Sequence, residues 1–167
     1  KVLAVSDHAG AIADQDGIDA FDLTDWVQEN GSVKGYPNAD WIEPSDLWSA
    51  DVDILIPAAL ENQITADNAN DIKAEVVVEA ANGPTTLEAE EILSEKSVDV
   101  LPDILVNAGG VIVSYFEWLQ NRSAQRWDLD DVDHRLREIL WAAADSVVAL
   151  QKDRESSSRR DAAYAVA

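Results

Sequence analysis

The stretch LPDILVNAGGVIVSYFEWLQN, Leu101–Asn121, decides the fold that we expect from the sequence. Its first part, Asp103–Val106, is mostly apolar and ends at Asn107, a residue type that often caps the start of a helix. The residues that follow are apolar at nearly every position, which is typical of a helix buried in a core. Asn107, Val111 and Ser114 are spaced four and three residues apart, so they share one face of that helix.

Two interpretations of this helix fit the stretch. Gly109 and Gly110 weaken a helix and supply no side-chain packing, which indicates that a ligand approaches the backbone there. Alternatively, the helix is a capped core element in which Ser114 bonds to a carbonyl one turn earlier and the glycines let a strand pack closely. The stretch alone favours neither interpretation, and the choice depends on the rest of the chain.

The composition describes an acidic chain that folds. Its 167 residues suffice for one domain with a core, and 47% of them are hydrophobic, with periodic spacing. It carries 33 acidic and 12 basic side chains, a formal net charge of −21. This charge disfavours nucleic acid and anionic membrane surfaces as partners. It is typical of halophilic proteins, which stay soluble at high salt, and an ordinary acidic cytoplasmic protein is the alternative.

What the chain lacks excludes several kinds of site. It has no cysteine, which excludes disulfides, thiol catalysis and cysteine-ligated zinc, and no apolar run long enough to span a membrane. His8 and His134 have no metal-ligand pattern around them, and Asp14–Asp19 lacks the spacing of a calcium loop, so we expect a turn there and no metal. Because the chain has no methionine and begins inside the apolar run Lys1–Val5, we expect a fragment of a longer protein.

Four short apolar runs alternate with helical patterns along the chain. We expect them to be buried strands of one mostly parallel sheet, covered by helices on both faces, in an α/β fold. The runs are Val2–Val5, Asp53–Pro57, Glu75–Val78 and Val98–Leu101. Parallel sheets of this kind bind ligands at the carboxyl ends of their strands, so the residues that follow each run are the candidates for a site.

The unusual residues of the chain fall at these strand ends: Asp7, Ala58, Ala59, Asn82 and Asn107. Asp7, which follows the first run, can accept a hydrogen bond from a ribose hydroxyl. The alternative is that it is a solvated aspartate in a turn. Small residues after the second strand leave room for a flat ligand. The coincidence favours a nucleotide cofactor. A glycine-rich phosphate turn is absent from the 167 residues, so we expect it upstream.

Capping residues predict where the helices begin. Asp22 is expected to cap a helix that ends near Glu29, and Thr85, with Glu88 at capping-box spacing, one that ends near Glu95. Thr65 is expected to begin a short helix, and Asp128 to cap a long amphipathic helix. We expect that long helix to break at Ser156–Ser158, where a capping box of Ser158 and Asp161 begins a last helix over Ala162–Ala167.

Five motifs distributed over the whole chain carry a family resemblance. They are AVSDHAG (Ala4–Gly10), PAALENQI (Pro57–Ile64), VVVEAANGPTT (Val76–Thr86), DILVNAGGVIVSYFEWLQN (Asp103–Asn121) and RRDAAYAVA (Arg159–Ala167). Together they resemble the glutamate dehydrogenases, here of a halophilic type. The resemblance implies a Rossmann-like, doubly wound fold. Residues 1–121 would form most of the dinucleotide-binding domain without its first strand and glycine-rich turn. Residues 122–167 would form C-terminal helices that pack toward an absent substrate domain.

The resemblance also implies a role for each candidate residue. Asp7 would lie near the adenosine ribose of NAD or NADP, and Ala58 and Ala59 beside the adenine side. The remaining implied contacts are Asn82 and Asn107 to the nicotinamide riboside, Val111 to the substrate, and Ser114 to the side-chain carboxylate of glutamate. The catalytic lysine and aspartate of the family match nothing in this sequence, so the resemblance implies no catalytic residue here and no turnover by these residues alone.

The implied reaction is the reversible oxidative deamination of L-glutamate to 2-oxoglutarate and ammonia, in a cytoplasmic homo-oligomer that would be a hexamer. Leucine- and phenylalanine-type dehydrogenases share the NAGGVI core and are the nearest alternative. Ser114 favours glutamate, because an apolar substrate has no use for a hydroxyl. A non-catalytic nucleotide-binding module is an alternative of a different class. The choice of cofactor stays open, since Asp7 suits a free ribose 2′-hydroxyl but basic groups elsewhere could offset its charge.

Overall fold

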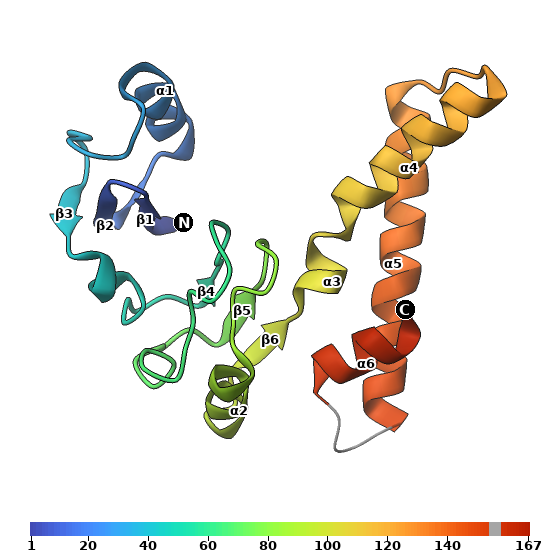
Figure 1. Cartoon of the computed structure of the whole chain (residues 1–167). Coiled ribbons are helices and arrows are strands. Elements are labelled where there is room, and N and C mark those ends of the chain that lie inside the picture. Colours follow the sequence, from blue (N-terminus) through green and yellow to red (C-terminus); the bar gives the residue numbers. More distant parts are fainter. Residues whose placement is uncertain (154–157) are drawn as a thin grey trace.

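The computed structural model describes residues 1–153 and 158–167, which form two three-stranded sheets and a set of helices (Figure 1). The first sheet is antiparallel, in the order β1 (Val2–Asp7), β2 (Gly10–Ile18), β3 (Asp40–Ile42). The second is parallel, in the order β4 (Ile54–Leu55), β5 (Val76–Val78), β6 (Asp99–Leu101). The second sheet and the helices confirm the expected α/β class.

The antiparallel sheet corrects two expectations about the first residues. The strand Val2–Val5 was expected in the parallel sheet, but β1 pairs with β2 as a hairpin that closes at Asp7 and Gly10. The segment Asp14–Asp19, expected as a turn, lies mostly inside β2. Part of β2 is exposed to solvent, so acidic residues fit there without interrupting the strand. The strand therefore combines a buried beginning with a polar middle.

The helices begin close to, but not always at, the expected caps. Asp19 rather than Asp22 caps the first helix, because its carboxylate accepts from two backbone N–H groups of the first turn. Thr86 rather than Thr85 caps the second. The helices are α1 (Ala20–Asn30), the 3₁₀ helix η1 (Pro44–Leu47), α2 (Leu87–Glu95), α3 (Asp103–Val106), α4 (Ala108–Ser123), α5 (Leu129–Asp153) and α6 (Arg159–Val166).

Three further expectations about the helices have different outcomes. The cap at Asp128 is confirmed, because its side chain accepts from the Asp131 N–H at 2.8 Å, and so is the capping box of Ser158 with Asp161. The short helix at Thr65 is wrong, since the residues after it form turns held by the Asn68 side chain. The break expected at Ser156–Ser158 falls, apart from Ser158, outside the described residues.

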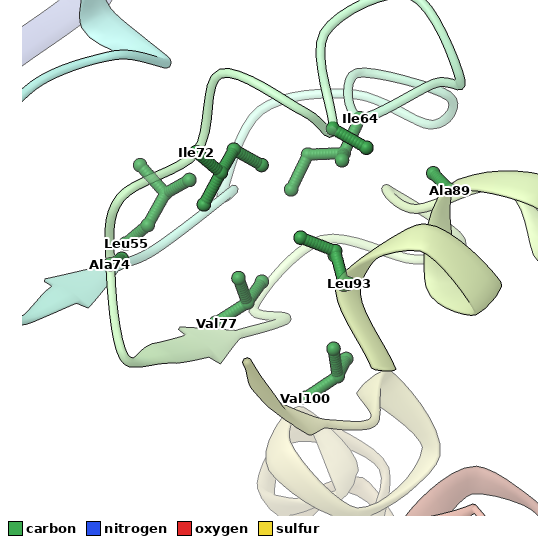
Figure 2. Close-up of a cluster of buried hydrophobic side chains, with 9 residues drawn as sticks. Leu55, Ile64, Ile72, Ala74, Val77, Ala89, Leu93 and Val100 are labelled. Atoms are coloured by element: carbon green, nitrogen blue, oxygen red, sulfur yellow. The ribbon is translucent and has the colours of Figure 1, made fainter. Parts of the chain in front are cut away.

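The largest core lies around the parallel sheet, where Leu93 of α2 packs with residues of the strands and of the segment between β4 and β5. Figure 2 shows these side chains converging from separate elements. Its members are Leu55, Ile64, Ala69, Ile72, Ala74, Val77, Ala89, Leu93 and Val100. A second cluster joins β2 to α1, and a third joins α5 to α6. Each sheet therefore has its own core.

The helix α4 is exposed, which corrects the expectation of a buried core helix. Of its side chains only Phe116 is buried, whereas Val111 is 69% and Trp118 50% exposed. The pair α4 and α5 extends away from the sheets, so no other described element covers most of the apolar surface of α4 (Figure 1). None of the described helices has the length and apolar content that a membrane crossing requires.

Candidate functional site

A pocket of about 590 Å³ opens beyond the carboxyl ends of two parallel strands. It is lined by residues 59–61 after β4, by residues 80–82 after β5, and by Asn107 and Val111 at the start of α4. The N–H groups of Ala80 and Ala81 both donate to the Pro57 carbonyl, at 3.1 and 3.0 Å, and so tie the two strand ends together. The pocket thus lies where ligands bind in sheets of this class.

The structure brings four of the expected site residues to this pocket. Ala59, Asn82, Asn107 and Val111 come from three separate segments and all contribute to its wall. Ala58 is adjacent in sequence but is not among the lining residues. The expectation that the segments after the four apolar runs meet at one place is therefore confirmed for the segments after β4, β5 and β6, and it is wrong for the segment after β1, which carries Asp7.

Two asparagine side chains lie in the wall of the pocket, which also includes the carboxylate residue Glu61. Nδ2 of Asn107 donates to Oδ1 of Asn82 at 2.7 Å and makes a longer contact of 3.4 Å to the Ala80 carbonyl. Among the described residues, Nδ2 of Asn82 and Oδ1 of Asn107 have no hydrogen-bond partner. A donor and an acceptor are therefore both available to a ligand that carries hydroxyl or amide groups.

Asn107 reaches Asn82 because it does not cap α4 as expected. The helical turn α3 already precedes it, and its N–H donates to the Asp103 carbonyl at 2.9 Å. Its side chain makes no capping bond to α4 and turns toward the loop after β5 instead. The expectation of a cap at Asn107 is wrong, and the amide is free to serve the pocket.

Asp7 lies away from the pocket, at the turn of the β1–β2 hairpin. Its two carboxylate oxygens accept from the N–H groups of Ala9 and Val33, each at 2.8 Å. These bonds join the hairpin turn to the segment after α1. In the described structure Asp7 therefore has the turn-stabilising contacts of the alternative interpretation, and it does not line the pocket.

Ser114 shows the local contact that the second interpretation of the helix predicts. Its hydroxyl donates to the Gly110 carbonyl at 2.9 Å, and the residue is exposed one turn beyond Val111. The glycines, in contrast, are not required for packing. A Cβ on Gly109 would meet only Leu136, at 3.9 Å, and one on Gly110 would meet nothing within 4 Å. The space beside these glycines stays open to a ligand.

A buried charge network lies behind the pocket, and sequence reasoning missed it. Glu79, the residue after β5, is fully buried, and both of its carboxylate oxygens accept from Nη2 of Arg160 on α6, at 2.7 and 2.8 Å. Burial alone lowers the pKa of the Arg160 guanidinium. The hydrogen bonds to Glu79 and Glu90 outweigh burial, so the pKa lies above its ordinary value. The only signal in the sequence was a glutamate directly after an apolar strand.

Similarity to known proteins covers the whole chain. Residues 1–167 match the family model described as Glutamate/Leucine/Phenylalanine/Valine dehydrogenase. The chain is 48% identical over 167 residues to the NADP-specific glutamate dehydrogenase A1 of Halobacterium salinarum. It is 46% identical over 166 residues to the NAD-specific glutamate dehydrogenase of Staphylococcus aureus strain COL. Each match covers 99% of this chain and 40% of the relative.

A solved structure shows the same fold. The chain superimposes with a TM-score of 0.90 and 29% identity on the hetero-hexameric glutamate dehydrogenase from Thermus thermophilus in its Leu-bound form. The match covers 99% of this chain and 39% of that one, so the chain spans about two fifths of the length of its relatives. The parallel sheet and strand-end pocket are thus part of a Rossmann-like fold. With the family model matched from the first residue to the last, the chain belongs to the glutamate/leucine/phenylalanine/valine dehydrogenase family.

Proposed function

We propose that this chain forms the nicotinamide end of the cofactor site in an NAD- or NADP-dependent glutamate dehydrogenase. The whole protein would interconvert L-glutamate with 2-oxoglutarate and ammonia. The observation that carries the proposal is the pair Asn82 and Asn107 in an open pocket at the strand ends, where one amide donor and one amide acceptor have no partner among the described residues. Relatives named as NAD-specific and NADP-specific enzymes support either cofactor.

The residues present fit the nicotinamide riboside of such a cofactor. Its ribose hydroxyls and carboxamide both donate and accept, as the amide pair requires. Ala59 and Ala80 leave the pocket wall flat, because neither fills it with a side chain beyond Cβ. Asn82 and Asn107 would hold the nicotinamide, and that group would supply the hydride-accepting chemistry of the reaction.

Toward the other end of the cofactor, Ala58 would face the adenine side, and Ala59 would lie where the adenine side meets the nicotinamide riboside. Asp7 would lie near the adenosine ribose, because each of its carboxylate oxygens keeps a second lone pair beside the bond to Ala9 or Val33.

The face of α4 that begins at the pocket is proposed to contact the substrate. Val111 lines the pocket, so it would pack against the carbon chain of glutamate. Ser114 lies one turn further from the amide pair and would donate to the side-chain carboxylate. A hydroxyl has a single hydrogen, so this donation requires Ser114 to release the Gly110 carbonyl that it bonds in the absence of substrate.

We propose that the rest of the longer protein completes the site. The first strand, the glycine-rich phosphate turn, the catalytic lysine and aspartate, and the substrate domain would come from it. The edges of the two sheets have room for an additional strand, because among the described residues β4 pairs only with β5 and β1 only with β2. Ile54 and Ile56, in and directly after β4, are more than half exposed, so a further strand could cover them. Residues 1–121 would belong to the dinucleotide-binding domain, and residues 122–167 to the helices that face the substrate domain.

The same proposal extends to the assembly and its setting. The similar Thermus thermophilus enzyme is described as hetero-hexameric, which supports an oligomer and, as the finer proposal, a hexamer. The net charge of −21 and the similarity to a Halobacterium salinarum enzyme support a halophilic protein. We place it in the cytoplasm, where soluble dehydrogenases meet their nicotinamide cofactors.

Ser114→Ala in the full-length protein tests the proposed function. Loss of one hydrogen bond to a charged group should lower kcat/KM for glutamate by about 10- to 150-fold, while kcat/KM for norvaline, which lacks the carboxylate, changes little. Ser123→Ala is the matched control, because Ser123 makes the same bond one turn back on α4, to the Leu119 carbonyl at 2.8 Å. A wild-type protein without glutamate-dependent NAD(P)H formation, or an unchanged glutamate-to-norvaline ratio in the variant, would overturn the assignment.

A further inference from the structure

One arginine joins three structural elements behind the pocket. Arg160 of α6 donates through Nη2 to Glu79 after β5, through Nε to Glu90 of α2 at 2.6 Å, and through Nη1 to Asp103 of α3 at 3.1 Å. Its side chain is only 12% exposed, and the three carboxylate side chains are 15% exposed or less. Every nitrogen of the guanidinium is therefore engaged, in the fixed planar geometry that only arginine offers.

Asp103 connects this network to both asparagines of the pocket. Its Oδ2 accepts from the Gly83 N–H at 2.7 Å, directly after Asn82. Its backbone carbonyl accepts from the Asn107 N–H at 2.9 Å, and its own N–H donates to Oε2 of Glu79 at 2.9 Å. One carboxylate residue thus holds the loop that carries Asn82 and the helical turn that ends at Asn107.

We propose that Arg160 is a positioning residue for the nicotinamide end of the cofactor site, acting through Asp103 on the Asn82–Asn107 amide pair. This inference rests on the proposed function. Arg160 does not line the pocket and has no direct contact with either amide. Its effect is transmitted by two steps, the ion pair to Asp103 and the bond from Gly83 to Asp103.

The electrostatics of the network explain why Arg160 cannot be replaced by a simpler group. Three carboxylates surround one cation, and Glu79 has no access to water that could stabilise its charge. Without the guanidinium the acids repel one another, and Asp103, which lies nearest the surface with Glu90, is free to move away from Glu79. A lysine in this position carries the charge but cannot direct donors to three carboxylates in one plane. The amide pair would then lose its fixed geometry.

Binding of two ligands to the full-length protein separates positioning from general stability. The first probe is the reduced cofactor that the wild type prefers. The second is the matching ADP-ribose, with a 2′-phosphate if that cofactor is NADPH, which lacks the nicotinamide. Arg160→Lys should raise the Kd of the reduced cofactor by about 10-fold, which corresponds to the loss of one or two hydrogen bonds between the amide pair and the nicotinamide riboside. The Kd of the ADP-ribose should stay within about twofold of the wild-type value. Fluorescence titration and calorimetry measure the two constants.

Arg159→Lys is the matched control. Arg159 is the preceding residue of α6 and pairs with Asp99 of β6 at 2.9 Å, away from the amide pair. The Arg159→Lys variant should leave the dissociation constants of the reduced cofactor and of the ADP-ribose unchanged. If Arg160→Lys does not fold, Glu90→Gln gives the same comparison to a smaller degree, because it removes the negative charge of one partner of the guanidinium and leaves Glu79 and Asp103 paired.

A double-mutant cycle completes the test. If Arg160 acts through the amide pair, its effect should largely disappear once Asn107→Ala has removed one amide. Adding Arg160→Lys to Asn107→Ala should then raise the Kd of the reduced cofactor little further, so the two effects should not be additive. Additive effects, or equal weakening of the reduced cofactor and the ADP-ribose, would overturn the positioning role while the proposed function stands. A wild-type protein that binds neither ligand would overturn the proposed function itself.

Discussion

Lys96, the residue after α2, holds the turn between β4 and β5 against the largest core. Its Nζ donates to the carbonyls of Asn70 at 2.5 Å and Ile72 at 2.7 Å, and it makes a longer contact of 3.4 Å to the Ala69 carbonyl. Ile72 and Ala69 are buried in the cluster that includes Leu93. We predict that Lys96→Met, which keeps an unbranched side chain but removes the donors, loosens this turn without changing the fold.

The magnitude follows from the three contacts. A hydrogen bond that involves a charged group contributes about 1.5–3 kcal/mol net. The contact to Ala69 is long enough to be discounted. Because Lys96 is exposed, water can replace part of the other two bonds. We therefore expect the free energy of local opening to fall by about 2 kcal/mol, which corresponds to roughly 30-fold faster hydrogen exchange.

Hydrogen exchange of the full-length protein, followed by mass spectrometry on peptides that cover residues 65–73, measures this opening directly. The amides of Ala69 and Asp71 report on it, since they donate to Thr65 and Asn68 within the turn. Lys73→Met is the control, because it removes the same charge from a lysine with no side-chain hydrogen bond or ion pair to the described residues. Equal exchange rates in the two variants would show that the Lys96 hydrogen bonds do not hold the turn, and that any effect comes from the change in net charge alone.

Two further predictions concern the hairpin and the charge. Gly10→Ala should lower the free energy of unfolding by about 1–3 kcal/mol more than Gly31→Ala in thermal or urea melts, because a Cβ on Gly10 would lie 1.8 Å from the Trp41 ring, whereas one on Gly31 meets nothing within 4 Å. Equal losses would leave only backbone strain as the cause. The melting temperature should rise from dilute buffer to molar potassium chloride, because salt shortens the Debye length to about 3 Å and screens the net charge of −21; an unchanged or lower melting temperature in salt would contradict the halophilic assignment.

The sequence was sufficient for those parts of the protein that local patterns determine. The runs Asp53–Pro57 and Glu75–Val78 contain the strands β4 and β5, because apolar runs between turn residues have few alternatives in a buried sheet. The capping box at Ser158 formed because its bonds span only three residues. The pocket residues Asn82 and Asn107 were also predictable, since parallel strands bring their carboxyl ends to one edge.

The tertiary structure decided everything that depends on partners distant in sequence. The direction of β1 was set by its hairpin with β2, which an apolar run cannot encode by itself. The exposure of α4 depends on what else packs against it, so an apolar sequence predicts burial but does not supply the covering surface. Arg160 meets Glu79 across 81 residues and Asp103 across 57. No local pattern marks such pairs, because a buried ion pair exists only once the chain has brought its charges together and excluded water from them.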